Sequence, residues 1–431
     1  MTQKNKIDYN IQRIKAAYNI KKKVIRKYKT TEEIREDHMA NRVNHRKKHE
    51  IKTTYYDKFQ CLASECPITC CKEWKISVDE KSSKKWNDTR WSDHGEAEHI
   101  ENAKTKKLSE YLIHYKEADV ICLNEKKECP FLDQKKLCKL VLRYGDQILS
   151  KTCREFPREI HEFKDRREYS LAACCPAVVD FWRDTQDVLD KEAMEKMESD
   201  IKNNKERHLY QLRMLLITCL EDQKISIEKA LLMGFYLLLE GKEGRVSYQQ
   251  EELEELSQAV DEMEIQLEDT FLEDNALFLD MTENYWKQGI YRIFLEPLRE
   301  EASRMETDDG YIENEFMQEY GKFLKVYRDQ ESLLRKYLIA EMFGQLLLAD
   351  YDWQDMTVAM QWIGMEYAIM RQAAFLTFKQ TGTLSYEQMK EVIVYIARMT
   401  GYDDADIWEY LEESFQTLIW EWGYFAFIIG K

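Results

Sequence analysis

The chain has 431 residues, of which 44% are hydrophobic and 12% aromatic, and it carries a formal net charge of −16. This composition excludes a largely disordered chain, and the length suggests two or three domains. The acidic balance argues against general affinity for nucleic acid and suits a cationic partner, such as a lysine-rich protein.

Residues 1–50 form a basic segment with fifteen Lys and Arg against six acidic residues, so the rest of the chain carries about −25. Apolar residues from Ile7 to Tyr28 recur near helical spacing, which predicts a basic helical arm. The segment has no apolar run of the kind that a secretory signal needs, and no stretch of the chain is long enough to span a membrane. The sequence therefore predicts a cytoplasmic protein.

Residues 51–180 contain ten of the eleven cysteines and four of the five prolines. Nine of these cysteines are clustered: Cys61, Cys66, Cys70, Cys71, Cys129, Cys138, Cys153, Cys174 and Cys175. Thiolate ligation needs several sulfurs that converge from short turns, and in a reducing compartment crowded thiols are more often ligands than disulfides. We therefore expect a cysteine-rich, metal-stapled domain with irregular loops.

The cysteine spacing leaves the metal open. The paired Cys-x2-Cys units of structural zinc sites are absent, and so is the Cys-x2-Cys-x2-Cys-x3-Cys run of bacterial ferredoxins. Adjacent side chains diverge, so Cys70 and Cys71 could serve two metal centres, or one of them could lie outside the ligand set. Either His114 or His161 could replace a thiolate. The pattern also predicts helices at 95–116 and 138–149.

Residues 181–431 contain one cysteine and one proline. Their apolar residues recur three and four positions apart, which predicts an acidic all-helical domain. We expect Cys219 to be a core thiol and the aromatic tail at 408–427 to pack in the core. The predicted fold is thus mainly α, with a basic arm at 1–50, the cysteine-rich domain at 51–180 and the helical domain at 181–431.

Three blocks of the cysteine-rich region carry a resemblance to a known family. The blocks "YYDKFQCLASECPITCCKEWKISVDE" (55–80), "CPFLDQKKLCKLVLRYGDQILSKTCREFPR" (129–158) and "REYSLAACCPAVVDFW" (167–182) resemble the flagellin lysine-N-methylase family. A looser similarity links them to zinc- or iron-chelating domain proteins. The matching cysteines are Cys61, Cys66, Cys70, Cys71, Cys129, Cys138, Cys153 and Cys175. Trp74, Asp79 and Arg158 also match, whereas Cys122 and Cys174 are additional.

The resemblance implies transfer of methyl groups from S-adenosylmethionine to lysine ε-amines of flagellin, with a [4Fe–4S] cluster at the cysteines and zinc as the alternative. No glycine-rich nucleotide loop is present, so the residues alone assign neither the donor site nor a catalytic base. A sulfonium methyl is already electrophilic, so we expect polar displacement. The alternative is a non-enzymatic chelating or sensing module whose helical domain binds a partner; a nucleic-acid-binding protein fits the net charge least.

Overall fold

A computed structural model describes residues 48–91, 106–115, 118–263, 265–308, 310–401 and 404–430. The chain divides into two compact units, residues 1–48 and 49–431. The predicted helical arm at 1–50 lies outside the described residues except for its last three, of which His49 and Glu50 begin a strand.

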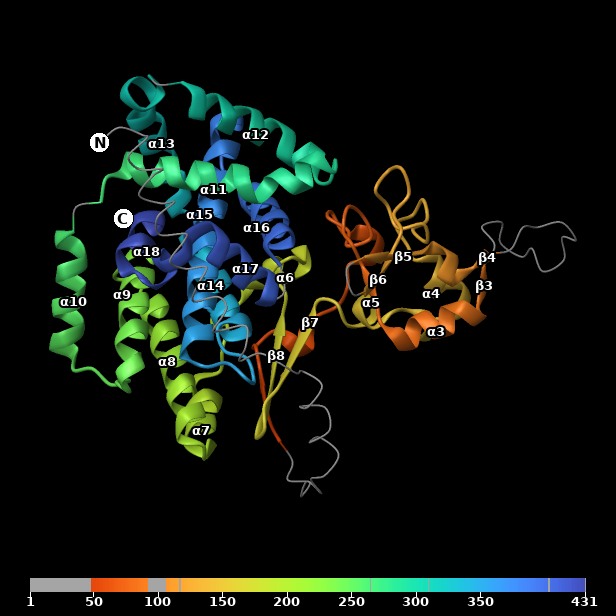
Figure 1. The fold of residues 1–431 in the computed structure, drawn as a ribbon, viewed down its shortest axis with the longest axis horizontal. Coiled ribbons are helices and arrows are strands. Elements are labelled where there is room, and N and C mark those ends of the chain that lie inside the picture. Colours follow the sequence, from red (N-terminus) through yellow and green to blue (C-terminus); the bar gives the residue numbers. More distant parts are fainter. Residues whose placement is uncertain are drawn as a thin grey trace, which may run out of the picture. The chain divides into compact units, whose positions relative to one another are not determined.

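The described part of residues 181–431 is helical, as the periodicity predicts, and contains no strand (Figure 1). We call its helices, together with the one that precedes them, the helical body. They are α6 (Pro176–Asp184), α7 (Lys191–Asp200), α8 (Asn204–Glu221), α9 (Ile227–Glu240), α10 (Gln250–Glu262), α11 (Leu267–Lys287), α12 (Arg292–Thr307), α13 (Met317–Arg328), α14 (Glu331–Gln345), α15 (Trp353–Thr381), α16 (Tyr386–Thr400), α17 (Asp404–Phe415) and α18 (Trp422–Ile429).

Helix α15 is the centre of this body. It packs against α9, α11, α13, α14, α16 and α18, and it is buried along most of its length, including polar residues such as Glu366 and Arg371. Asp352 caps its N-terminus by accepting hydrogen bonds from the backbone N–H groups of Gln354 and Asp355. Gly382, at φ 70°, ends it in the left-handed conformation that glycine adopts without strain.

The expectation of irregular loops at 51–180 is only partly correct, because this region contains short sheets. Strands β1 (His49–Lys52), β8 (Arg166–Leu171) and β7 (Arg158–Glu162) form one sheet in that order, with β1 parallel and β7 antiparallel to β8. Strands β2 (Ser77–Val78), β6 (Ala118–Ile121) and β5 (Leu112–Tyr115) form an antiparallel sheet, and β3 (Arg90–Trp91) pairs with β4 (Lys106–Lys107). Strands this short carry little periodicity from which to predict them.

Residues 61–155, the cysteine lobe, have a small core of their own, in which Trp86 and Trp91 pack against Phe131. The lobe contains helices α3 (Glu80–Asp88), α4 (Lys139–Tyr144) and α5 (Lys151–Glu155). The prediction of a helix at 95–116 is wrong for its described part, where residues 106–115 form β4, a 3-10 turn and β5. The helix predicted at 138–149 ends early at Tyr144, because Gly145 takes φ 76°.

The main core extends beyond the helices. It includes Ile51, Tyr55 and Ile68 from the cysteine-rich region, and buried Trp182 donates a 2.8 Å hydrogen bond to the Tyr55 hydroxyl. The aromatic tail packs in this core as predicted, and Cys219 is partly buried against it. Within the described residues, no helix is both long enough and apolar enough to cross a membrane.

Candidate functional site

The eight cysteines that the sequence singled out line one cavity of about 460 Å³, which we call the cysteine cavity. They come from seven places along 115 residues of chain, and the fold brings them to the same space. Cys122, Cys174 and Cys219 do not line it, and neither does His114 or His161. The structure therefore separates the matched cysteines from the additional ones.

Short turns and helix starts aim these thiols. Cys129 donates its backbone N–H to the Cys71 carbonyl at 2.8 Å, which holds the first and second cysteine blocks (55–80 and 129–158) side by side. Cys138 and Cys175 stand at the N-terminal caps of α4 and α6, where the chain turns into a helix. Cys153 lies in the first turn of α5, and Ser150 accepts its backbone N–H.

Asp79 joins two segments of the lobe. Its carboxylate caps α3 by accepting the N–H of Ser82 at 3.0 Å, and its other oxygen accepts the N–H of Lys151 at 2.7 Å. Against the opposing effect of burial, these hydrogen bonds lower the pKa of Asp79 to about 2. Because Lys151 begins α5, Asp79 positions the helix that carries Cys153.

Arg398 of α16 ties the cysteine loops to the helical body. Its guanidinium donates to the carbonyls of Ile68 at 2.8 Å, Cys174 at 3.1 Å and Thr69 at 3.3 Å, and it lies 5.2 Å from the ring centre of Trp74. Arg398 is only 4% exposed. One buried side chain thus fixes the loop before Cys70 and the turn before Cys175.

The thiols fall into two groups by their electrostatic neighbours. Cys129 and Cys153 both interact with Cys71 and Cys138, and Cys70 interacts with Cys71 and Cys153, whereas Cys175 interacts with Cys61 and Cys66. Burial raises the pKa of the Cys153 thiol to about 11 and that of Cys175 to about 12. A hydrogen bond from the Cys70 thiol instead lowers the pKa of Cys71 to about 7.

The chemistry of this donor set suits a thiolate-bound metal or cluster. Eight thiols face one largely apolar space, and the guanidinium groups of Arg158 and Arg398 line its wall, where they complement the negative charge of thiolates. Among the described residues, however, no three His, Cys, Asp or Glu side chains are already arranged to hold a metal ion. Metal binding therefore remains a prediction.

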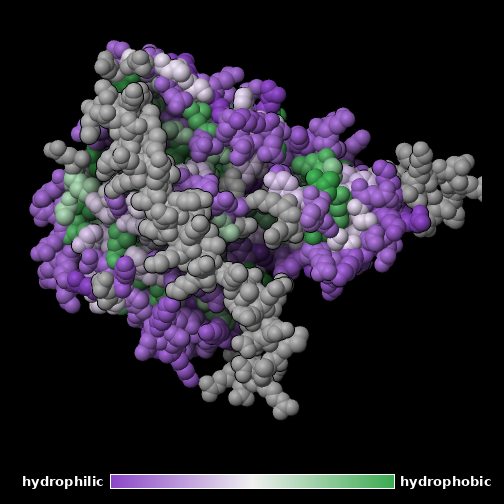
Figure 2. Space-filling model, in the orientation of Figure 1, coloured by the Kyte–Doolittle hydropathy of each residue, from purple (hydrophilic) through white to green (hydrophobic). Residues whose placement is uncertain are grey.

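The rim of the cavity is apolar. Leu62, Val141 and Leu142 line it and are exposed, Leu142 to 64%. In the face seen in Figure 2, a small hydrophobic patch lies on the otherwise hydrophilic cysteine lobe, and further hydrophobic patches lie over the helical body. Exposed apolar patches rimmed by polar residues are typical of binding surfaces.

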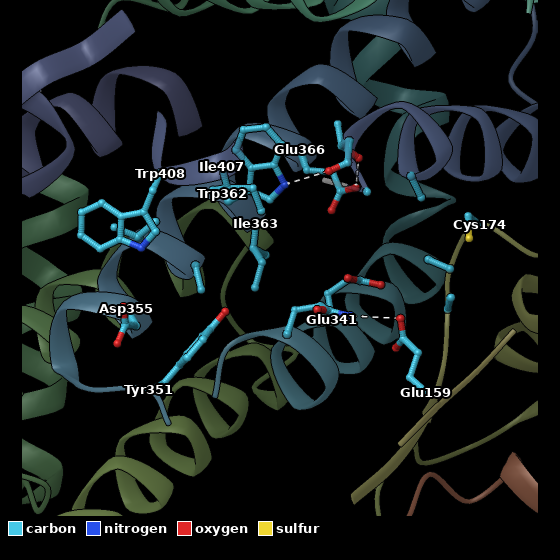
Figure 3. Close-up of a pocket in the computed structure, with 18 residues that line it drawn as sticks. Glu159, Cys174, Glu341, Tyr351, Asp355, Trp362, Ile363, Glu366, Ile407 and Trp408 are labelled. Atoms are coloured by element: carbon cyan, nitrogen blue, oxygen red, sulfur yellow. Dashed lines mark hydrogen bonds between the residues drawn. The ribbon is translucent and has the colours of Figure 1, made fainter. Parts of the chain in front are cut away.

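A second cavity, of about 250 Å³, lies between the helical body and the segments around β7 and β8 (Figure 3). Three glutamates from separate elements line it: Glu159 of β7, Glu341 of α14 and Glu366 of α15. No Lys, Arg or His is among its lining residues, so we call it the acidic cavity. Sequence reasoning missed it because the three glutamates are far apart in the chain and nothing in their neighbourhoods distinguishes them from other acids.

The two cavities share a wall. At three places, one residue lines the acidic cavity and its neighbour in the chain lines the cysteine cavity. These pairs are Glu159 with Arg158, Cys174 with Cys175, and Ala397 with Arg398. The two cavities are therefore lined by consecutive residues along three separate stretches of backbone.

The fold and site define a class of mainly helical protein in which many cysteines converge on a cavity beside an acidic pocket. The family of FliB lysine N-methylase C-terminal domains matches residues 213–428, half of the chain. The chain belongs to this family, as the resemblance predicts. The match covers most of the helical body, whereas the resemblance lies in the cysteine blocks that precede it.

The chain is also similar to curated relatives. It is 32% identical over 127 residues to a lysine-N-methylase of Salmonella typhimurium (strain LT2), covering 29% of this chain and 30% of that protein. It is 31% identical over 120 residues to the flagellar biosynthetic protein FliU of Salmonella muenchen, covering 28% and 68%. Less than a third of each lysine-N-methylase is therefore matched. No solved structure is significantly similar to this chain.

Proposed function

We propose that this protein is a protein-lysine N-methyltransferase that uses S-adenosylmethionine to methylate flagellin in the cytoplasm, before export. Membership of the FliB lysine N-methylase family across residues 213–428 carries the proposal. The relatives' names, lysine-N-methylase and flagellar biosynthetic protein, support the reaction and the flagellar connection. The convergence of eight cysteines on one cavity is the feature of this chain on which the cofactor rests.

The cysteine cavity would hold a [4Fe–4S] cluster, with zinc as the alternative. Cys71, Cys129, Cys138 and Cys153 supply four neighbouring thiols, which is the number that one such cluster takes. Cys70, which interacts with Cys71 and Cys153, and a separate group of Cys61, Cys66 and Cys175 also line the cavity. A cluster held by all four thiols would support the fold, whereas one held by only three of them would leave one iron free to bind the amino and carboxylate groups of the methyl donor.

The chain's own residues must free a lone pair on the substrate lysine. A lysine near its ordinary pKa of about 10.4 is protonated at neutral pH, and removing that proton costs about 4.6 kcal/mol. The amine then attacks the sulfonium methyl: the N–C bond forms, the S–C bond breaks and its electron pair leaves with the thioether. Desolvation of the ammonium and a nearby base lower this cost.

The proposal is tested by incubating anaerobically purified protein with S-adenosylmethionine and flagellin, and by measuring the mass of flagellin peptides. We expect lysine-containing peptides to gain the mass of one or more methyl groups. Cys129→Ser should abolish the gain, whereas Cys122→Ser, in the same lobe but outside the cavity, should retain it. Parent protein that binds metal but transfers no methyl would contradict the proposal and favour a chelating module.

A further inference from the structure

The rim of the cysteine cavity exposes apolar side chains from two separate segments. Leu62, directly after Cys61, is 38% exposed, and the neighbouring residues Val141 and Leu142 of α4 are 37% and 64% exposed. The same two segments supply thiols to the cavity, Cys61 and, at the N-terminal cap of α4, Cys138. A molecule that covers these apolar side chains therefore lies beside the thiols.

The charged side chains that line the cysteine cavity are all cationic. They are Lys136, Arg154, Arg158 and Arg398, and no Asp, Glu or His is among the described residues that line it. Two of the four are held by the protein itself. Arg398 is buried and donates to three carbonyls, and Arg158 donates to the Phe59 carbonyl at 3.4 Å and lies 5.0 Å from the centre of its ring.

The other two cations are exposed and loosely held. Lys136 donates to the Cys66 carbonyl at 3.5 Å, and the Arg154 guanidinium lies 4.0 Å from the Glu155 carboxylate. Both distances are long for a hydrogen bond or an ion pair. Lys136 and Arg154 can therefore turn toward carboxylates of a partner without breaking a strong interaction within the chain.

This lining selects among lysine-bearing segments. The net charge of the whole chain suits a lysine-rich partner, but a segment with several lysines would meet like charges at this cavity. Like charges that face each other oppose association, whereas opposite charges favour it and fix the register. A lysine flanked by carboxylates and apolar side chains matches both the charge and the apolar rim.

We propose that the rim of the cysteine cavity binds a segment of the substrate protein in which apolar residues and carboxylates flank the lysine. Leu62, Val141 and Leu142 would cover the apolar side chains, and Lys136 and Arg154 would pair with the carboxylates. The lysine side chain would then enter the same cavity that takes the methyl donor. This rests on the proposed function, which assigns the donor to that cavity.

The first test measures the binding of short fluorescent peptides, each with a single lysine, to anaerobically purified protein. The reference peptide has leucines beside the lysine and glutamates beyond them; glutamine or arginine replaces the glutamates in two others, and serine replaces the leucines in a further one. We expect fluorescence anisotropy to show affinity ~10-fold lower for the glutamine and serine peptides, and lowest for the arginine peptide. Equal affinities of the glutamate and arginine peptides would overturn the proposal.

Substitutions at the rim give the second test. Leu142→Ser should weaken the reference peptide ~10-fold, whereas Leu272→Ser, at an exposed leucine of α11, should leave it unchanged. Lys136→Glu should weaken the glutamate peptide and strengthen the arginine peptide. Lys126→Glu, an exposed change in the same lobe but outside the cavity, should keep the parent order. The parent order in Lys136→Glu would refute the pairing with carboxylates.

A second copy of this chain is the competing occupant of the rim. It predicts that the parent self-associates in sedimentation experiments, that Leu142→Ser abolishes the self-association, and that peptide affinity does not depend on the flanking charges. That combination would overturn the proposal.

Kinetics separates this proposal from the proposed function. Leu142→Ser should raise KM for flagellin ~10-fold and leave kcat and metal content unchanged, because contacts at the rim are the same before and during methyl transfer. Parent-like KM in both Leu142→Ser and Lys136→Glu would refute the docking surface alone. Charge-dependent peptide binding by a parent that methylates nothing would refute the methyltransferase function instead.

Discussion

Replacing Arg398 with leucine should loosen the cysteine loops from the helical body. The change removes three hydrogen bonds from a charged donor and leaves the carbonyls of Ile68 and Cys174 buried without that partner. Hydrogen bonds to charged groups contribute about 1.5–3 kcal/mol each, and they are not additive in one cluster. We therefore expect Arg398→Leu to reduce the free energy of unfolding by about 3–5 kcal/mol.

Lys136→Gln is the matched control. Lys136 also lines the cysteine cavity and donates to a carbonyl of the same loop, that of Cys66 at 3.5 Å, but it is exposed. Its replacement should change the free energy of unfolding by no more than about 0.5 kcal/mol. Urea unfolding and hydrogen exchange of residues 66–74 measure both variants. Parent-like unfolding and exchange in Arg398→Leu would refute the role assigned to this arginine.

Three further substitutions test the packing around the site. Asp79→Asn should destabilise the protein by about 1–2 kcal/mol at pH 7. Because the pKa of Asp79 in the folded protein, about 2, lies below the ordinary 3.8, the extra stability of the parent should be full above pH 4 and should fade as the pH falls toward 2. A difference in melting temperature that does not change with pH would contradict this. Glu168→Gln leaves the fully buried Arg166 and Arg213 without their shared carboxylate and should lower the free energy of unfolding in urea by about 3–5 kcal/mol. Glu162→Gln, at an exposed ion pair with Arg167, should lower it by less than about 1 kcal/mol. Equal losses in the two variants would refute the distinction between buried and exposed ion pairs. Gly364→Ala would place a Cβ against the Phe425 ring, closer than atoms can approach, and should cost about 1–3 kcal/mol. Gly321→Ala, with open space around it in α13, should be neutral or stabilising. The reverse order in calorimetry would show that α15 and α18 pack differently.

Helical periodicity was enough to predict the body, because amphipathic patterns persist over segments as long as α8, α11 and α16. The sequence likewise predicted that the clustered cysteines come together, since thiols crowded on proline-containing turns in a reducing compartment are typical of metal ligands. The short strands were not predictable, because β2 and β3 are two residues long and depend on tertiary pairing.

The acidic cavity depends on long-range geometry that spacing does not encode. Glu341 and Glu366 are separated by a helix end, a turn and half of α15 before they face the same space. The link through Arg398 is similar, because this residue reaches back about 330 positions to the Ile68 carbonyl. Such contacts emerge only when the helices are packed, so the sequence singled out the cysteines that line one cavity but not the residues that hold them in place.

The most direct test of the account is the metal, sulfide and donor response of the anaerobically purified protein. The account predicts about four irons and four sulfides per protein chain, with a visible spectrum that shifts when S-adenosylmethionine is added. Substitution of serine for Cys129 should remove both the iron and the shift, and Cys122→Ser should remove neither. Zinc alone, with no response to the methyl donor, would contradict the account and leave the cysteines as a structural staple.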